Sequence, residues 1–172
     1  INRLLTDQMS DLLYTTDTGA RDNLVCEGID PQRIHFVGNL MIDSLHDALP
    51  RALSPTETLL AAGVVDTLAS RVGGGYALVT LHRPSNVDNP KVLAGHVDTL
   101  LRTAQHLPVL WPVHPRAKAM LEQSGLWAKL QAANIACLAP QGYLEMVGLM
   151  RDAKLVITDS GGVQEETTAL GV

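Results

Sequence analysis

Short apolar segments alternate along this chain with longer segments in which apolar residues recur every three or four positions. The short segments are rich in Val, Ile, Leu and Tyr and predict buried strands at residues 11–15, 33–37, 76–81, 109–113, 135–138 and 155–158. The longer segments predict helices at residues 19–27, 41–49, 56–72, 90–106, 115–130 and 143–152. Strands and helices that alternate in this way indicate βαβ units, so the expected fold class is α/β with parallel sheets.

Two breaks in this pattern suggest how the chain is divided. The stretch from Pro50 to Pro55 and the run Gly73-Gly74-Gly75 bracket a segment that connects two lobes. We therefore expect one α/β domain to end near residue 44 and a second to begin near residue 75. The chain starts without Met and stops at Val172, inside a predicted helix or just at its end, so we expect an internal fragment of a longer protein.

Composition excludes several classes of function. The chain has 172 residues, 46% of them hydrophobic, and a net charge of -5 with only 13 Lys and Arg, which argues against non-specific nucleic-acid binding. Cys26 and Cys137 are isolated and match no metal-ligand spacing, so both are expected to be reduced. No signal peptide or long apolar run is evident, and we expect a cytoplasmic protein without a metal site.

The last predicted strand leads into a turn with the chemistry of a phosphate site. After it come Ser160, Gly161 and Gly162, and then a helix whose first backbone N–H groups lack helical partners. Glycines let an anion approach the backbone closely, and Ser160 is a suitable N-cap. Glu166 follows about 6 Å further along the helix axis, at about 1.5 Å per residue, where its carboxylate suits a ribose diol. A tight turn alone also fits this pattern.

Polar residues also follow the other strands of the second lobe. Because ligands bind beyond the carboxyl ends of parallel strands, these exits are expected to converge on one crevice. The residues at the exits are His82, Arg83, His114, Gln141, Asp159 and Ser160.

Four motifs make the sequence resemble a known family. They are Thr-Leu-His-Arg-Pro-Ser-Asn at 80–86, Pro-Val-His-Pro at 112–115, Pro-Gln-Gly-Tyr-Leu at 140–144 and Thr-Asp-Ser-Gly-Gly-Val-Gln-Glu-Glu at 158–166. In order and spacing they resemble the non-hydrolysing UDP-N-acetylglucosamine 2-epimerases. The resemblance implies two Rossmann-like domains of the glycosyltransferase-B type. Residues 1–44 would be the C-terminal part of the N-terminal domain, 45–74 the crossover helices, and 75–172 most of a UDP-binding C-terminal domain.

The resemblance also implies roles for the residues that match. Ser160, Gly161 and Gly162 would bind the diphosphate, Glu166 the ribose, and Gln141 with its neighbours the uracil. Met146 stands where the family usually has an aromatic wall of the base pocket, and a Met side chain also packs on a base.

Three further residues have implied roles near the diphosphate. His82 is the catalytic candidate, contacting the diphosphate and helping UDP to depart. Arg83 and His114 would line the same cleft, where a second, activating UDP-sugar binds in bacterial members. Asp159 is expected to shape the turn and not to abstract a proton.

The activity implied is that of an isomerase that converts UDP-N-acetylglucosamine to UDP-N-acetylmannosamine by UDP elimination and re-addition, without a cofactor. The partners implied are these two UDP-sugars, with no nucleic acid or membrane involved. The full-length protein is expected to be a homodimer serving surface polysaccharide synthesis. The family's catalytic carboxylates would precede Ile1, so this fragment alone is expected to be inactive.

Other functions remain open from the sequence. A hydrolysing 2-epimerase or a glycosyltransferase-B-type transferase would bind the same nucleotide with a similar domain. A UDP-sugar sensor without turnover is also possible. The string Asp159-Ser160-Gly161-Gly162 also surrounds the nucleophile of trypsin-like proteases, but those are all-β proteins, unlike the α/β pattern here.

Overall fold

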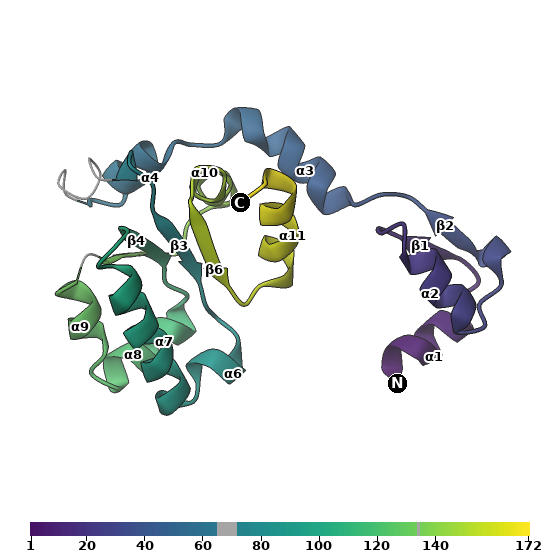
Figure 1. Ribbon diagram of the computed structural model, residues 1–172, viewed down its shortest axis with the longest axis horizontal. Coiled ribbons are helices and arrows are strands. Elements are labelled where there is room, and N and C mark those ends of the chain that lie inside the picture. The colour runs from purple at the N-terminus through teal and green to yellow at the C-terminus, as the bar shows by residue number, and fades with distance from the viewer. Residues whose placement is uncertain (65–71, 134) are drawn as a thin grey trace. The chain divides into compact units, whose positions relative to one another are not determined.

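The computed structural model describes residues 1–64, 72–133 and 135–172, which form two compact units, Ile1–Ser44 and Leu45–Val172 (Figure 1). The division falls within helix α3 (Leu40–Ala48). The helix expected over residues 56–72 is present as α4 (Pro55–Ala61), and residues 65–71 of that prediction lie outside the described part of the chain.

The first unit is a small parallel α/β arrangement. Its elements are α1 (Asn2–Met9), β1 (Leu13–Thr15), α2 (Ala20–Cys26), a short 3-10 helix (Pro31–Arg33) and β2 (Ile34–Phe36). The two strands are parallel, with Leu13 opposite Ile34. These two residues form a small core with Leu24 and Ile29.

The second unit holds the larger sheet. Its strands are β3 (Ala77–Thr80), β4 (Val109–Pro112), β5 (Ile135–Leu138) and β6 (Leu155–Thr158). After α4 and a 3-10 helix (Leu49–Arg51), its helices are α6 (Pro84–Val87), α7 (Pro90–Thr103), α8 (Pro115–Gln123), α9 (Trp127–Gln131), α10 (Tyr143–Arg151) and α11 (Gly161–Leu170).

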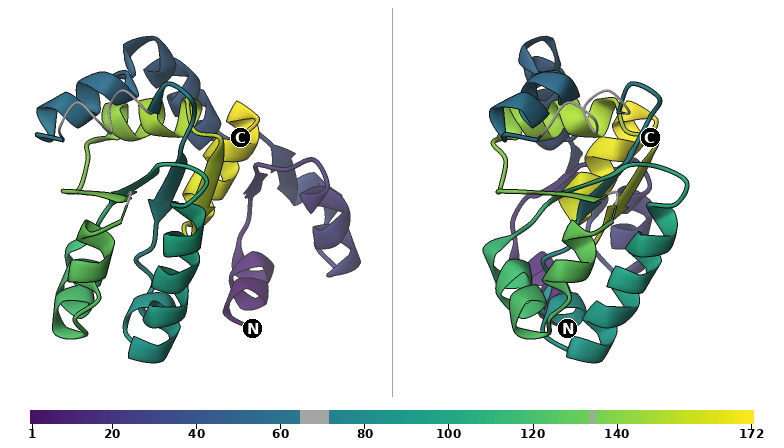
Figure 2. Two further views of the ribbon diagram at one scale, coloured as in Figure 1. Left: turned by 60° about the vertical axis from the view of Figure 1, so that its left-hand side comes forward. Right: turned by 90° about the vertical axis from the view of Figure 1, so that its left-hand side faces the viewer.

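Helices cover both faces of this sheet (Figure 2). On one face, Val79 and Trp111 pack with apolar residues of α7, α8 and α9. On the other, Leu78 and Leu110 pack with residues of α4, α10 and α11. Successive strand residues point to opposite faces, so strands that are apolar at nearly every position place side chains in the cores on both sides of the sheet.

The strand order is β5-β4-β3-β6, and every pairing is parallel. The chain moves outward from β3 through β4 to β5 and then returns to place β6 on the other side of β3. This reversal is a topological switch point, where ligands of open parallel sheets bind beyond the carboxyl ends of the strands. Thr80 lies opposite Thr158 at that end.

The helix expected over residues 115–130 is two helices. Between α8 and α9 lies Gly125, whose positive φ of 69° a helix does not allow. Short α6 was not expected from the sequence, although Pro84 at its first position is a usual helix start. Among the described residues, no helix is long and apolar enough to cross a membrane.

Candidate functional site

A pocket of about 220 Å³ opens beyond the carboxyl ends of the second unit's strands. Residues at or just after the ends of all four strands contribute to its lining, together with one residue of α10 and one of α11. The lining residues are Thr80, Leu81, His82, Pro112, His114, Pro140, Gln141, Met146, Ser160 and Val163. The volume is below the range of about 300–1,000 Å³ usual for small-molecule sites, so this pocket fits only part of a nucleotide sugar.

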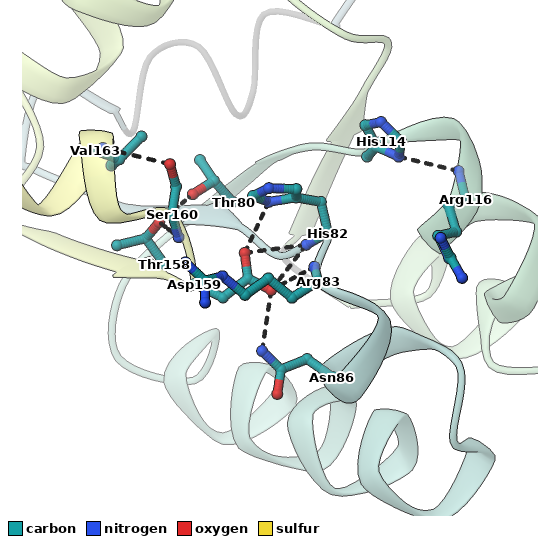
Figure 3. A network of polar contacts seen from close by, with 10 residues as sticks. All are labelled: Thr80, His82, Arg83, Asn86, His114, Arg116, Thr158, Asp159, Ser160 and Val163. Atoms are coloured by element: carbon teal, nitrogen blue, oxygen red, sulfur yellow. Dashed lines mark hydrogen bonds and ion pairs between the residues drawn. The ribbon is translucent and has the colours of Figure 1, made fainter. Parts of the chain in front are cut away.

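Asp159 is the centre of the polar contacts beside this pocket (Figure 3). Its side chain is 6% exposed, and its Oδ1 lies 2.8 Å from Nδ1 of His82. Its Oδ2 accepts hydrogen bonds from the backbone N–H of Arg83 at 2.8 Å and from Nδ2 of Asn86 at 3.0 Å. The backbone N–H of His82 also donates to this carboxylate. Asp159 therefore holds both the backbone and the ring of His82.

The protonation of this carboxylate follows from its contacts. Burial by itself raises the pKa of Asp159, but the hydrogen bonds from Asn86, Arg83 and His82 outweigh burial and lower it. Asp159 is thus ionised at neutral pH and accepts the Nδ1 proton of His82. That arrangement leaves Nε2 of His82 available to a ligand.

Threonine hydroxyls join the two strands on either side of the switch point. Oγ1 of Thr80 lies 2.6 Å from Oγ1 of Thr158, which also accepts the backbone N–H of Ser160 at 3.0 Å. Ser160 then caps α11, its Oγ accepting the N–H of Val163 at 3.4 Å, so the N-cap expected from the sequence is confirmed. These contacts fix the turn that begins α11.

The start of α11 presents free backbone donors. In the described part of the chain, the N–H groups of Gly161 and Gly162 have no hydrogen-bond partner. A Cβ added at Gly161 would meet no atom within 4 Å. The open space beside these N–H groups and the positive end of the helix dipole suit an anion such as phosphate.

A second histidine is held beside the same pocket. The rings of His82 and His114 have centroids 6.1 Å apart. His114 is the N-cap of α8, and its Nδ1 accepts the backbone N–H of Arg116 at 3.2 Å. With Nδ1 an acceptor, the proton of the neutral ring is on Nε2, which can donate to a ligand.

The remaining residues expected at the site fall into two groups. Gln141 and Met146 line the pocket, and Nε2 of Gln141 donates to the carbonyl of Ala139 at 2.8 Å. Arg83 and Glu166 do not line it. Neither do Gly161 and Gly162, which begin the helix that carries Glu166.

Glu166 has a partner that the sequence did not indicate. The hydroxyl of Tyr143, the first residue of α10, donates to Oε1 of Glu166 at 3.1 Å. Asp159 was expected to shape the turn, but its contacts with His82 and Asn86, and the contact of Thr158 with Thr80, were not anticipated. Their polar side chains near strand ends were the available signal, but their partners depend on which strands are neighbours.

A larger hollow, of about 700 Å³, lies within the first unit. It lies among α1, β1 and α2 and is lined in part by Arg3, Asp7 and Glu27. Arg3 pairs there with both carboxylates. Among the described residues, β1 is the one strand whose end lines this hollow, whereas four strand ends line the smaller pocket, which is therefore the better candidate for binding.

Several known proteins are similar to this chain in sequence. A family model described as "UDP-N-acetylglucosamine 2-epimerase" matches residues 1–172. A Pseudomonas aeruginosa protein, named UDP-2,3-diacetamido-2,3-dideoxy-D-glucuronate 2-epimerase, is 40% identical over 99% of this chain and 44% of its own length. A Methanococcus maripaludis UDP-N-acetylglucosamine 2-epimerase is 35% identical over 99% of this chain and 46% of its own.

Solved structures give the same result. The UDP-GlcNAc 2-epimerase of Methanocaldococcus jannaschii superposes with a TM-score of 0.77 at 35% identity, covering 99% of this chain and 47% of that one. Its complex with UDP-GlcNAc and UDP gives a TM-score of 0.73 at 33% identity over 99% and 46%. The expected α/β class with parallel sheets is confirmed, and the chain spans about half the length of the proteins it matches.

Proposed function

Because the chain belongs to the UDP-N-acetylglucosamine 2-epimerase family, we propose that the complete protein interconverts UDP-N-acetylglucosamine and UDP-N-acetylmannosamine. The observation that carries the proposal is the start of α11 beside His82, which Asp159 holds through the ring and the backbone. That pair of features supplies donors for a diphosphate and an oriented imidazole at the same end of one sheet. The activity belongs to the complete protein, since the chain spans about half the length of its relatives.

The proposed reaction is an elimination followed by an addition. A base removes the C2 proton, the C1–C2 double bond forms and the C1–O bond breaks, releasing UDP and a glycal. UDP oxygen then adds back to C1 while C2 receives a proton on its opposite face. The net change is an inversion at C2, so no oxidant or reductant is consumed.

Residues of this chain serve the leaving group in this proposal. The N–H groups of Gly161 and Gly162 and the hydroxyl of Ser160 bind the diphosphate, whose negative charge grows as the C1–O bond breaks. His82 presents Nε2 to the same group because Nδ1 is engaged by Asp159. Preorganised donors of this kind stabilise a developing charge without reorganising during the reaction.

Different residues are proposed to bind the ribose and the uracil of the nucleoside. Glu166 accepts hydrogen bonds from the ribose diol, and Gln141 and Met146 contact the uracil. Met146 supplies apolar surface to the base. Arg83 and His114 remain candidates for a second UDP-sugar site. Within the described residues, no hydrogen bond or ion pair of the Arg83 guanidinium competes with such a ligand.

A second substrate deserves the same test. The P. aeruginosa relative, at 40% identity, is named for a UDP-sugar with a second acetamido group and a uronate carboxylate. Arg83 and His114 offer donors that also suit a carboxylate. The alternative is therefore the same C2 inversion on a diacetamido uronate, with UDP bound in the same way.

Proton NMR of the complete protein in D2O distinguishes these reactions. We expect UDP-N-acetylglucosamine to gain deuterium at C2 and to give UDP-N-acetylmannosamine signals. If only the diacetamido uronate gains deuterium at C2, the alternative substrate is the correct one. Free UDP with free sugar would indicate the hydrolysing branch, and an inert substrate would favour a transferase or a sensor.

A further inference from the structure

Two residues that flank the nucleoside region are joined by a hydrogen bond between different helices. Tyr143 begins α10 immediately after Gly142, and Glu166 lies on α11. The Tyr143 hydroxyl donates to Oε1 of Glu166 at 3.1 Å, although Tyr143 as a residue is 48% exposed. The contact therefore links α10, which follows Gln141, with α11, which begins at the turn formed by Ser160 and Gly161.

We propose that Tyr143 is a positioning residue that orients the Glu166 carboxylate for the ribose hydroxyls, and this rests on the function proposed above. Glu166 is partly exposed and has several rotatable bonds, so without a partner its carboxylate samples many orientations. The Tyr143 hydroxyl selects one of them before the ligand arrives.

The geometry leaves Glu166 able to bind. Tyr143 uses one lone pair of Oε1, and among the described residues no group donates a hydrogen bond to Oε2. An ionised carboxylate has about four acceptor sites, so enough remain for two ribose hydroxyls. Burial and the hydrogen bond to Glu166 both raise the pKa of Tyr143, so its hydroxyl stays protonated and remains a donor at neutral pH.

The size of the effect follows from the cost of ordering one side chain. Fixing a long side chain on binding costs about 0.5–1.5 kcal/mol, which corresponds to about a two- to twelve-fold change in affinity. We therefore expect Tyr143→Phe to weaken UDP binding about two- to twelve-fold. The same variant should raise KM for the UDP-sugar while kcat stays within about two-fold, because Tyr143 does not touch the reacting carbons.

The test is isothermal titration of the complete protein with UDP and with 2′,3′-dideoxy-UDP, which lacks both ribose hydroxyls. Tyr143→Phe, Glu166→Gln and the double variant are compared with wild type. Tyr14→Phe is the matched control, since it removes the same atom from another exposed tyrosine, one in the first unit. We expect Tyr143→Phe to weaken the binding of UDP but not of dideoxy-UDP. In the Glu166→Gln background we expect Tyr143→Phe to leave UDP affinity unchanged.

Each other outcome has a definite meaning. If Tyr143→Phe binds UDP as tightly as the wild type does, the inference about Tyr143 is wrong. The proposed function would still stand, because the wild type binds UDP. A penalty that persists with dideoxy-UDP or with Glu166→Gln would also overturn the inference about Tyr143, because the hydroxyl would then act elsewhere. A wild-type protein that binds no UDP would overturn both proposals.

Discussion

Nδ1 of His82 lies 2.8 Å from Oδ1 of Asp159, although the two residues are 77 positions apart in the sequence. The contact exists because β6 pairs with β3, so the turns that follow these strands are neighbours. Asp159 is nearly buried whereas His82 is half exposed, which makes the carboxylate the fixed partner and the imidazole the accessible one.

Asp159→Asn should reduce turnover by the complete protein and also destabilise it. The amide places an N–H2 group against the donors of His82, Arg83 and Asn86, which costs about 1–3 kcal/mol of unfolding free energy. We expect kcat to fall about ten- to hundred-fold, because His82 would lose its fixed orientation and with it part of the rate contribution of a positioned acid or base. The measurements are the NMR assay and urea denaturation.

Asp88→Asn is the matched control for this change. It breaks the exposed pair with Arg116, and such pairs contribute little to stability because water screens their charges. If Asp88→Asn lowers kcat as much as Asp159→Asn does, the special role of Asp159 in holding His82 is wrong.

Acid should destabilise the second unit partly through Asp159. Its pKa in the folded chain is lower than its usual value of 3.8, so the unfolded chain binds more protons in this range. The stabilisation is therefore present above the pKa of the unfolded chain and is lost as the pH falls through the lower pKa of the folded chain. Urea midpoints at pH 6 and pH 3 should differ more for wild type than for Asp159→Asn. Equal differences would contradict the assignment.

Gly148→Ala should be strongly destabilising. A Cβ at Gly148 of α10 would overlap the backbone carbonyl oxygen of Leu53, and a side-chain rotation cannot relieve this clash. We expect a loss of about 1–3 kcal/mol or more in unfolding free energy. Gly95→Ala in α7, where a Cβ meets nothing within 4 Å, should instead gain up to about 1 kcal/mol. Similar denaturation midpoints for the two variants would contradict this close approach.

Gly161→Ala should separate binding from stability. The added methyl meets no protein atom, so the denaturation midpoint should change little. The methyl occupies space beside the free N–H groups, and we expect UDP affinity in the complete protein to fall at least about ten-fold, since it hinders close approach of a phosphate to the backbone. Unchanged UDP affinity would place the diphosphate elsewhere.

The two cysteines should differ in reactivity. Cys26 is exposed, whereas burial raises the pKa of the Cys137 thiol to about 11. Because the thiolate is the reactive form, iodoacetamide at pH 7.5 should modify Cys26 first and leave Cys137 largely unmodified until the chain is denatured. Peptide mass spectrometry measures both sites, and Cys26→Ser confirms the assignment.

Local sequence patterns were sufficient for the α/β class and for several helix starts. The strands that form the large sheet alternate with helical segments, and Ser160 caps α11 because its side-chain oxygen satisfies a free N–H of the first turn. The expected single helix over residues 115–130 was wrong, since the run of apolar positions continues across Gly125 while its positive φ ends the helix.

The residues that surround a ligand site, by contrast, depended on strand order. The sequence alone determined that polar residues follow buried parallel strands and that a glycine turn opens a helix suited to an anion. Only the tertiary structure decided that β6 lies beside β3, which brings Asp159 to His82 and Thr158 to Thr80. The same is true of Tyr143 and Glu166, because packing between helices, and not any local periodicity, joins them. Local patterns encode what each segment prefers, whereas long-range contacts are chosen by how the segments bury their apolar faces together.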